Sequence, residues 1–258
     1  MDELFETGER KIFWTDEQME AEGLIPEEVW SGEEITPVEK ILETEISTQV
    51  PGMETAIVCG DPYGLGKLLD FQQGFDNPYG MFGTCGLTSV SNLCVMNGQE
   101  VTEPDVVTYA MENGLCAPPG GDSPFGGGGT TIGNLIDILG HYRIEAHCEF
   151  NDTADCERLA EVIEGGHGVI LGLNSGVLQD REWKIYNDQG EVTATHAVCL
   201  TATVRDPDTG ELTGFYMCDS SSQRPDGAQI YVTMDEMNEC YTELKDGFAV
   251  ITDKPIRS

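Results

Sequence analysis

The spacing of apolar residues changes along the chain, and it predicts helices first and strands later. Between residues 85 and 166, apolar side chains recur every three or four positions, which is the period of an amphipathic helix. Capping residues and glycines bound four such segments. The predicted helices are CGLTSVSNLCVMN (85–97), TEPDVVTYAMENG (102–114), TTIGNLIDILGHYRI (130–144) and TADCERLAEVIEGG (153–166).

After residue 166 the sequence favours strands. β-branched and aromatic residues gather in short runs, which turn signals such as RDPDTG (205–210) separate. One helix is predicted among them, in MDEMNECYTEL (234–244). Helices followed by strands with short connections predict an α+β fold with an antiparallel sheet. The predicted strands are TAIVCGDPYG (55–64, ending in a turn), GVILGLN (168–174), HAVCLTATV (196–204), ELTGFYMCD (211–219), AQIYVTM (228–234) and GFAVITD (247–253).

The first fifty-odd residues differ in composition from the rest of the chain. Residues 1–50 carry 15 acidic and only 3 basic side chains. Two short helices are predicted there, TDEQMEAEGL (15–24) and TPVEKILETEI (36–46), each with a threonine as its N-terminal cap. We therefore predict two parts: an acidic N-terminal arm or pro-segment at 1–55, and one compact domain at 56–258.

The charge of the whole chain restricts its partners. The formal net charge is −34, from 47 acidic and 13 basic residues. Nucleic acids and anionic membranes are polyanions, so neither is expected as a partner. No apolar run is long enough to span a membrane, and the acidic, polar start is not a secretory signal. A cytoplasmic protein, or one exported without a classical signal peptide, is expected. The sequence indicates no oligomeric state.

The cysteines indicate a protein that folds in a reducing compartment. There are nine, an odd number that a complete disulfide framework cannot use. They form no C-x-x-C pair and no Cys/His cluster at zinc spacing, so no metal and no cofactor are predicted. Cys94, Cys148, Cys199 and Cys240 lie in apolar periodic segments and are predicted to be core residues.

Cys85 differs from the other cysteines in its position. It lies between small residues in GTCG (83–86), at the start of the predicted helix 85–97. The partial positive charge at a helix N-terminus favours the thiolate, which is the nucleophilic form of the side chain. The small neighbours leave room for a substrate carbonyl, and the Cys85 backbone N–H can donate to an oxyanion. A buried structural thiol is the alternative, and a neighbouring base decides between them.

A base and a residue that orients it are predicted from strand pairing. His196 opens the predicted strand 196–204, and Asp219 ends the predicted strand 211–219. A short connection joins these strands, so antiparallel pairing brings the start of the first beside the end of the second. Asp219 is therefore predicted to lie next to His196 and to orient its ring. A histidine at the rim of the sheet and an aspartate in a turn are the alternatives.

A side-chain donor for the oxyanion comes from DFQQGF (70–75). Gln72 and Gln73 lie about a dozen residues before Cys85. Taken alone, a glutamine in a polar loop is a weak signal.

The order glutamine, cysteine at a helix start, histidine opening a strand and aspartate ending the next strand resembles the papain-like cysteine peptidases. The compact bacterial C39-like group is the most similar. The resemblance covers roughly residues 56–255. The matching segments are GDPYGLGKLLDFQQ (60–73), GTCGLTSVSN (83–92), LGLNSGVLQD (171–180), THAVCLTATV (195–204) and FYMCDSS (215–221).

The resemblance implies a fold and a set of roles. A helical N-terminal part would carry the cysteine, and a C-terminal antiparallel sheet would carry the histidine and aspartate. Cys85 would be the nucleophile, His196 the general base and then the acid, and Asp219 the residue that orients His196. Gln73, or in its place Gln72, would complete the oxyanion hole. The spacer GFDNPYGMFGT (74–84) is longer than the family leads us to expect, and it leaves the choice of glutamine open.

The implied activity is hydrolysis of a peptide or amide bond in a peptide or protein substrate. The same triad serves a deamidase or a transglutaminase-like effector, and a papain fold can also serve as an inactive binding module. GGGGTT (126–131) lacks the lysine that a phosphate-binding loop requires, so we interpret it as a flexible loop before a helix cap that could border the cleft. DPDTGE (206–211) lacks the glutamate at the twelfth position of a calcium loop and is interpreted as a hairpin turn.

The resemblance generates a prediction for the acidic arm. If residues 1–55 are an inhibitory pro-segment, their removal by limited proteolysis is expected to increase the rate of peptide hydrolysis. Activity is measured before and after cleavage, with the cleaved product identified by mass spectrometry. No gain in activity after removal contradicts the prediction.

Overall fold

A single antiparallel sheet of eight strands forms the centre of the molecule in the computed structural model, which describes residues 44–120, 126–179, 186, 190–221 and 227–256. Every strand pair is antiparallel within these ranges. The strands are β1 (Thr44–Ser47), β2 (Ala56–Gly60), β3 (Ala146–Phe150), β4 (Val169–Leu173), β5 (His196–Arg205), β6 (Leu212–Cys218), β7 (Ile230–Thr233) and β8 (Phe248–Thr252).

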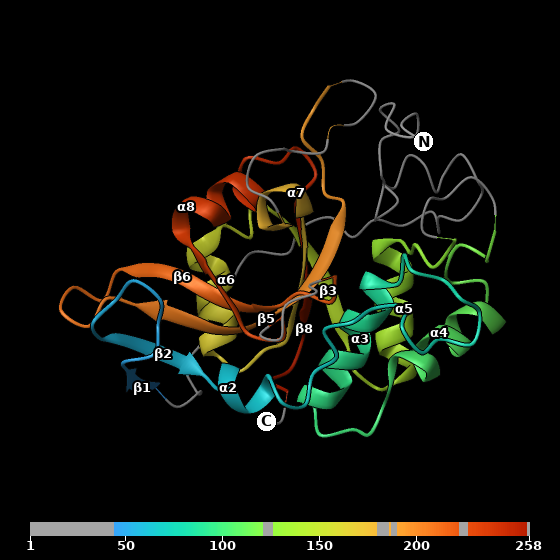
Figure 1. Cartoon of the computed structure of the whole chain (residues 1–258), viewed down its shortest axis with the longest axis horizontal. Coiled ribbons are helices and arrows are strands. Elements are labelled where there is room, and N and C mark those ends of the chain that lie inside the picture. Colours follow the sequence, from blue (N-terminus) through green and yellow to red (C-terminus); the bar gives the residue numbers. More distant parts are fainter. Residues whose placement is uncertain (1–43, 121–125, 180–185, 187–189, 222–226, 257–258) are drawn as a thin grey trace, which may run out of the picture.

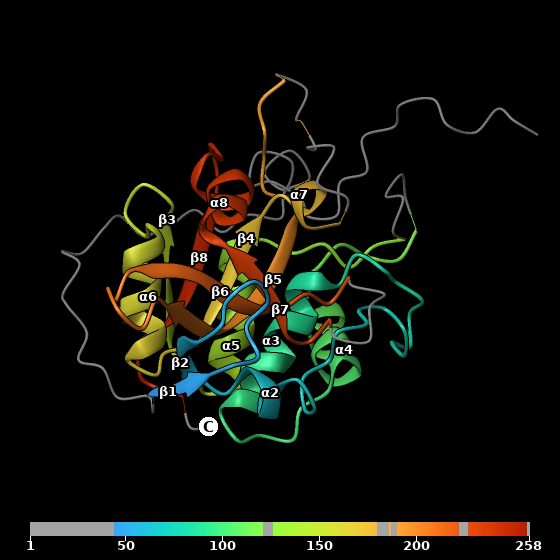
Figure 2. The ribbon, with the colours of Figure 1, turned by 60° about the vertical axis from the view of Figure 1, so that its left-hand side comes forward.

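Helices cover both faces of this sheet (Figure 1). They are α2 (Pro62–Leu65), α3 (Cys85–Met96), α4 (Glu103–Glu112), α5 (Ile132–His141), α6 (Cys156–Glu164), α7 (Ser175–Gln179) and α8 (Met234–Met237), which continues into the π-helical turn η1 (Asn238–Thr242). Helices α3, α4 and α5 gather on one side, and α6 and α8 lie on the other, as the turned view also shows (Figure 2). The fold is therefore a mixed α and β structure with an antiparallel sheet, as predicted.

Alternate residues of the central strands face the two helical layers. In β4, Ile170 belongs to the apolar core shared with α3, α4 and α5, whereas Val169 and Leu171 belong to the core shared with α6 and η1. The same alternation in β5 assigns Cys199 to the first core and Val198 to the second. Successive side chains of a strand point to opposite faces, so a strand covered on both faces is apolar throughout.

Strand β5 is the longest of the described strands and pairs along both of its edges. Its first half pairs with β4, in a register that sets Leu173 opposite His196. Its second half pairs with β2. The other edge pairs with β6, with Cys199 opposite Cys218. This register brings the first residue of β5 close to the residues that follow β6.

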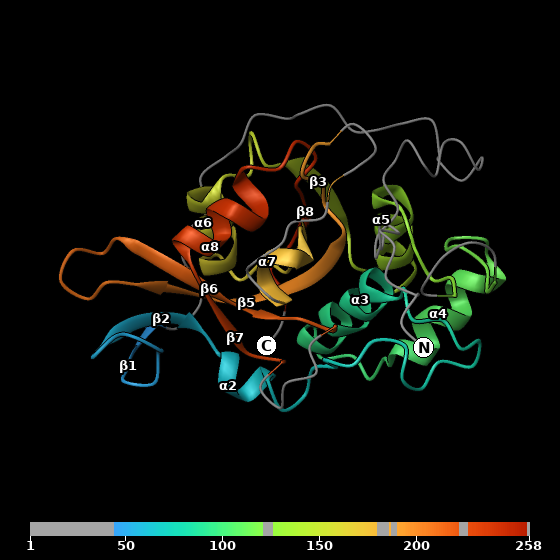
Figure 3. The ribbon, with the colours of Figure 1, turned by 45° about the horizontal axis from the view of Figure 1, so that its top comes forward.

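Helix α3 is the central helix of the first core. Eleven of its 12 residues are buried, and α4 and α5 lie on the side of α3 that faces away from α6 and α8 (Figures 1 and 3). Two hydrogen bonds tie its first turns to β5. The Ser89 hydroxyl donates to the carbonyl of Ala197 at 3.3 Å, and the Cys199 thiol donates to the carbonyl of Ser89 at 3.2 Å.

Most predicted elements are confirmed, and the differences lie where local pattern is weak. The four helices of the first half and the predicted strands are present. Strand β3 was not predicted, because its sequence AHCEF has no clear alternation. The helix predicted at 234–244 is confirmed only in part, because its second half forms the wider turn η1.

One prediction near the N-terminal arm is wrong. Residues 44–46 were predicted to end a helix, but they form strand β1, which pairs with β2. Pairing with β2 satisfies the backbone groups of this segment and overrides its local helical pattern. The sheet therefore begins before the predicted boundary at residue 55. The predicted helix 15–24 and most of the predicted arm lie outside the described residues, so the pro-segment role stays a prediction.

A glycine between β4 and β8 allows a stability prediction. Gly172 lies directly opposite Phe248, and a Cβ at this position would overlap the buried Phe248 ring. Because the ring is enclosed, Gly172→Ala is expected to lower the free energy of unfolding by about 1–3 kcal/mol. Urea unfolding measures the change.

Gly140, in α5, provides the matched control, because no atom lies within 4 Å of a Cβ added there. Gly140→Ala is expected to leave stability unchanged or to raise it by up to about 1 kcal/mol. Equal effects of the two substitutions would contradict the packing explanation.

Candidate active site

Cys85 is the first residue of α3, as predicted. The contacts between α3 and the sheet hold it in place. The preceding residue, Thr84, is in the N-cap position, yet its side chain makes no capping hydrogen bond to the helix. The N–H groups of the first turn are therefore not occupied by this cap, and they carry the partial positive charge of the helix N-terminus. Since Ser89 is bound to β5 one turn later, the Cys85 end of the helix lies over the start of that strand.

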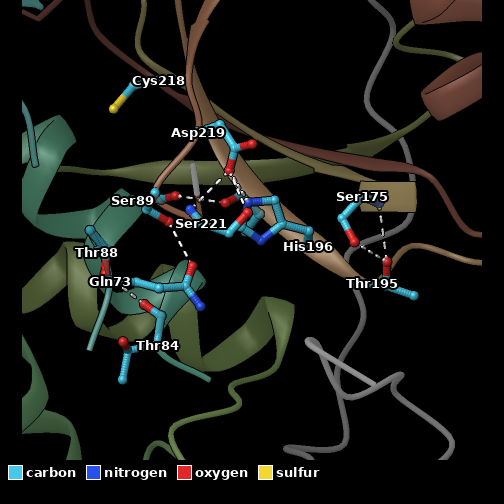
Figure 4. A network of polar contacts seen from close by, with 12 residues as sticks. Gln73, Thr84, Thr88, Ser89, Ser175, Thr195, His196, Cys218, Asp219 and Ser221 are labelled. Atoms are coloured by element: carbon cyan, nitrogen blue, oxygen red, sulfur yellow. Dashed lines mark hydrogen bonds and ion pairs between the residues drawn. The ribbon is translucent and has the colours of Figure 1, made fainter. Parts of the chain in front are cut away.

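His196 and Asp219 form a close pair, as strand geometry predicts. The His196 Nε2 atom lies 2.6 Å from the Asp219 Oδ1 atom, and both side chains are buried. The same Asp219 oxygen accepts hydrogen bonds from the backbone N–H and the hydroxyl of Ser221, at 2.9 and 2.8 Å. Figure 4 shows the three side chains directed toward one another. These contacts fix the carboxylate and, through it, the plane of the imidazole ring.

Each residue of this pair shifts the pKa of the other. Burial lowers the pKa of His196, but the negative charge of Asp219, the hydrogen bond to it and the Cys85 sulfur together raise that pKa to about 10. Burial raises the pKa of Asp219, while the charge of His196 and the hydrogen bonds from His196 and Ser221 lower it, and the net direction is down. The imidazolium and carboxylate forms therefore stabilise each other.

The second ring nitrogen of His196 is available for chemistry with Cys85. No described group makes a hydrogen bond of normal geometry to Nδ1, which is buried. The Cys85 sulfur nevertheless lies close enough to contribute to the raised pKa of the ring. Because Nε2 donates to Asp219, a neutral His196 has its free lone pair on Nδ1, which can accept a proton from the thiol.

Gln73, rather than Gln72, lies beside this group. The Gln73 side-chain N–H donates to the carbonyl of Phe82 at 2.7 Å, and its carbonyl oxygen accepts from the Ser220 hydroxyl at 2.9 Å. Its backbone N–H also donates to the Ser220 carbonyl, at 2.8 Å. Gln73 thus bridges the residue after Asp219 and the loop that leads to Cys85. Gln72 is exposed.

The three other histidines of the chain have contacts elsewhere in the structure. His141 stacks on Tyr109, with ring centroids 3.7 Å apart. His147 lies between Asp253 and Glu149, and the His167 ring contacts a backbone carbonyl of β8. All nine cysteines are buried, and none forms a disulfide.

Two further findings concern ligands and membranes. The described part of the chain contains no group of three or more His, Cys, Asp and Glu side chains arranged to hold a metal ion. Within the same ranges, no helix has both the length and the apolar character that crossing a membrane requires.

Cys85 and His196 have no solvent-exposed surface in this conformation, each being 0% exposed. Protein atoms therefore enclose both the sulfur and the imidazole ring.

Sequence reasoning did not identify Ser221 and Glu103 as part of this site. Ser221 follows Asp219 by two residues, and an aspartate followed by serines is a local signal for such a turn. Glu103 lies in a helix-capping sequence, TEPD, which explains its presence without reference to Cys85. Only the structure brings its carboxylate to the residue before Cys85.

Comparisons with known proteins leave the family open. No family model matches the chain. An uncharacterized protein of Mycobacterium bovis and one of Mycobacterium tuberculosis are each 23% identical over 209 residues, which cover 75% of this chain and 84% of theirs. These relatives are bacterial, and identity at this level does not assign a family.

Two solved structures are distantly similar. One is a double glycine motif protease from an AMS/PCAT transporter, in complex with the leader peptide, at 14% identity and a TM-score of 0.38 over 66% of this chain and 84% of that one. The other is SERA5E from Plasmodium falciparum, at 14% identity and a TM-score of 0.45 over 78% of this chain and 97% of that one. Scores this low assign neither a fold nor an activity.

The His196–Asp219 pair predicts a pH-dependent contribution to stability. The folded pKa of His196 is above the unfolded value of about 6.5, so the full contribution is present below that pH. It is lost as the pH rises toward the folded pKa of about 10. On the acid side, the contribution of the pair to stability is lost only below the ordinary aspartate pKa of about 3.9, because the pKa of Asp219 is lowered.

The test compares wild type with Asp219→Asn in urea unfolding across pH. The difference in free energy of unfolding is expected to be largest near pH 5 to 6, about where both partners are charged in the fold and His is charged in the unfolded chain. It is expected to shrink toward pH 10. A difference that does not change with pH contradicts a charged pair.

Proposed function

We propose that this protein is a papain-like cysteine peptidase of the C39-like type, which hydrolyses a peptide or amide bond. Cys85 is the nucleophile and His196 the general base and then the acid. Asp219 orients the ring, and Gln73 completes the oxyanion hole. The observation that carries the proposal is the buried His196–Asp219 pair, 2.6 Å apart, together with the Cys85 sulfur at a helix N-terminus, which is close enough to raise the pKa of the same imidazole ring.

The chemistry follows from the order of these groups. His196 Nδ1 accepts the thiol proton, and the Cys85 sulfur attacks the carbonyl carbon of the substrate. The oxyanion that forms accepts hydrogen bonds from the Cys85 backbone N–H and the Gln73 side chain. His196 returns its proton to the leaving amine as the C–N bond breaks, leaving an acyl-enzyme. Water, deprotonated by His196, then attacks the thioester and releases the acid and the thiol.

The donor geometry of Gln73 supports its role. Its Nε2 atom has two hydrogens, and one is used in the bond to Phe82. Its amide orientation follows from its neighbours, since the Ser220 hydroxyl donates to the oxygen and the Phe82 carbonyl accepts from the nitrogen. The second hydrogen is available for an oxyanion.

The burial of the catalytic pair is the observation that favours a different function. A papain fold whose cysteine and histidine are closed to solvent also fits a catalytically inactive binding module. The arrangement of charges supports the enzyme instead, because a buried histidine and aspartate cost free energy that a binding module has no need to retain.

Thiol labelling tests the proposal. A thiol-directed peptide electrophile at low concentration is expected to label the wild type, and Cys85→Ala is expected to abolish that labelling. Cys94→Ala is the matched control: it removes another buried thiol of α3, whose pKa burial raises to about 12. Peptide mapping identifies the labelled residue. Equal labelling of the wild type and Cys85→Ala overturns the proposal.

Mass spectrometry of a treated proteome separates the outcomes that this triad allows. A peptidase produces new chain termini, and a deamidase or transglutaminase-like effector produces mass shifts at glutamine. If neither new termini nor glutamine mass shifts appear, and Cys85 of the intact protein is not labelled, the protein is a binding module.

A further inference from the structure

A buried carboxylate joins the two segments that meet at the proposed active site. Glu103, the first residue of α4, is 2% exposed. Its two oxygens accept the backbone N–H of Gly74, at 2.8 and 3.0 Å, and one of them also accepts the Thr84 hydroxyl at 2.5 Å. Gly74 follows Gln73 directly, and Thr84 precedes Cys85 directly. One carboxylate therefore holds the residue next to the proposed oxyanion donor and the residue next to the nucleophile.

The contacts of Glu103 differ from those of an ordinary buried ion pair. Burial raises its pKa, and the charge of Asp70 raises it further, while hydrogen bonds from Thr84, Gly74 and Asn77 lower it; the net direction is up. The partners that lower it are neutral donors, and the start of α4 adds the positive end of a helix dipole. A carboxylate held in this way is costly to bury, so its hydrogen bonds must have good geometry.

The spacer between the two segments is long, but it is internally braced. Residues 74–84 leave the site and return to it, and Asn77 closes the loop. Its side-chain N–H donates to the carbonyl of Met81, and its side-chain oxygen accepts the Met81 N–H at 3.1 Å. Gly74 has a φ of +77°, and a Cβ there would lie 2.7 Å from the Met81 carbonyl oxygen. The loop thus returns to a defined position at the point where Glu103 binds it.

The hydroxyl bond from Thr84 has a second consequence. Threonine at an N-cap ordinarily accepts a hydrogen bond from the helix backbone. The Thr84 hydroxyl instead points to Glu103, and its side chain does not cap α3. Glu103 therefore keeps this side chain away from the helix N-terminus, where the nucleophile lies.

We propose that Glu103 is a positioning residue that sets Gln73 relative to Cys85 and leaves the start of α3 open to the oxyanion. The proposal rests on the proposed function, since it assigns the arrangement of that same site. Glu103 acts through Gly74 and Thr84, whose N–H and hydroxyl groups it accepts. By holding both ends of the spacer 74–84, Glu103 also explains how the Gln73 amide can lie near Cys85 although the spacer is long.

The test is Glu103→Gln in the full chain, with kcat and KM measured on a peptide substrate. The glutamine side chain has the same shape as glutamate, but its NH2 group is a donor. It would therefore face either the Gly74 N–H or the Thr84 hydroxyl, each of which is itself a donor. We expect kcat to fall by about 10- to 100-fold with little change in KM, because misplacing an oxyanion donor affects the transition state. In the Gln73→Ala background, Glu103→Gln is expected to add little, because the group that it positions is already absent.

Glu164→Gln is the matched control for the loss of a buried carboxylate. Glu164, in α6, is 1% exposed and binds Arg205 at 2.6 Å, on the other face of the sheet. It is expected to lower the melting temperature with no change in kcat. Thr84→Val, which removes the same hydrogen bond from the other side, is expected to lower kcat, while Thr84→Ser retains it. These variants keep the test informative if Glu103→Gln folds poorly.

Amide hydrogen exchange provides a readout that does not depend on turnover. The Gly74 N–H is expected to be protected in the wild type and to lose protection in Glu103→Gln. Unchanged protection, or kcat losses that add fully to those of Gln73→Ala, overturns the role of Glu103. Absence of Cys85-dependent turnover in the wild type contradicts the proposed function itself. A Cys85-dependent wild type with an equally active Glu103→Gln contradicts the role of Glu103 alone.

Discussion

The pairing of β5 along both edges is the constraint on which the rest of the site depends. β4 and β2 share one edge of this strand, and β6 takes the other. A one-residue slip in any of these registers would turn His196 to the opposite face of the sheet, because strand side chains alternate. The register with β6 also delivers Asp219 to the ring of His196. Many backbone hydrogen bonds between the strands thus determine where His196 and Asp219 lie.

The helix that carries Cys85 is set against this strand by packing. Its nearly complete burial leaves little freedom to rotate or slide, and the hydrogen bonds of Ser89 fix its first turns to β5. A dense interior transmits such constraints over several turns. The proposed nucleophile and base come from two layers of the fold, a helix and the sheet that it covers, and the position of each is maintained by the core between them.

Buried charge is concentrated around this junction. His196 and Asp219 neutralise each other, whereas Glu103 relies on neutral donors. Isolated charges are strongly disfavoured in a protein interior, so each of these groups is retained at a cost that good geometry must offset. The chain as a whole has the opposite character: it carries a large acidic excess, which we expect to disfavour polyanionic partners. The chemistry that we propose therefore operates in an interior whose electrostatics differ from those of the exterior.

The sequence by itself determined the parts of this protein that depend on local pattern. The start of α3 at Cys85 followed from helical spacing, and the approach of Asp219 to His196 followed from two strands joined by a short turn. The first inference is local, and the second involves two strands that are neighbours along the chain. Tertiary structure alone decided that residues 44–47 form a strand, that Gln73 rather than Gln72 lies beside the pair, and that Glu103 holds both ends of the spacer. These features depend on contacts between distant segments, whose hydrogen bonds override local propensity and leave no periodic signal in the chain.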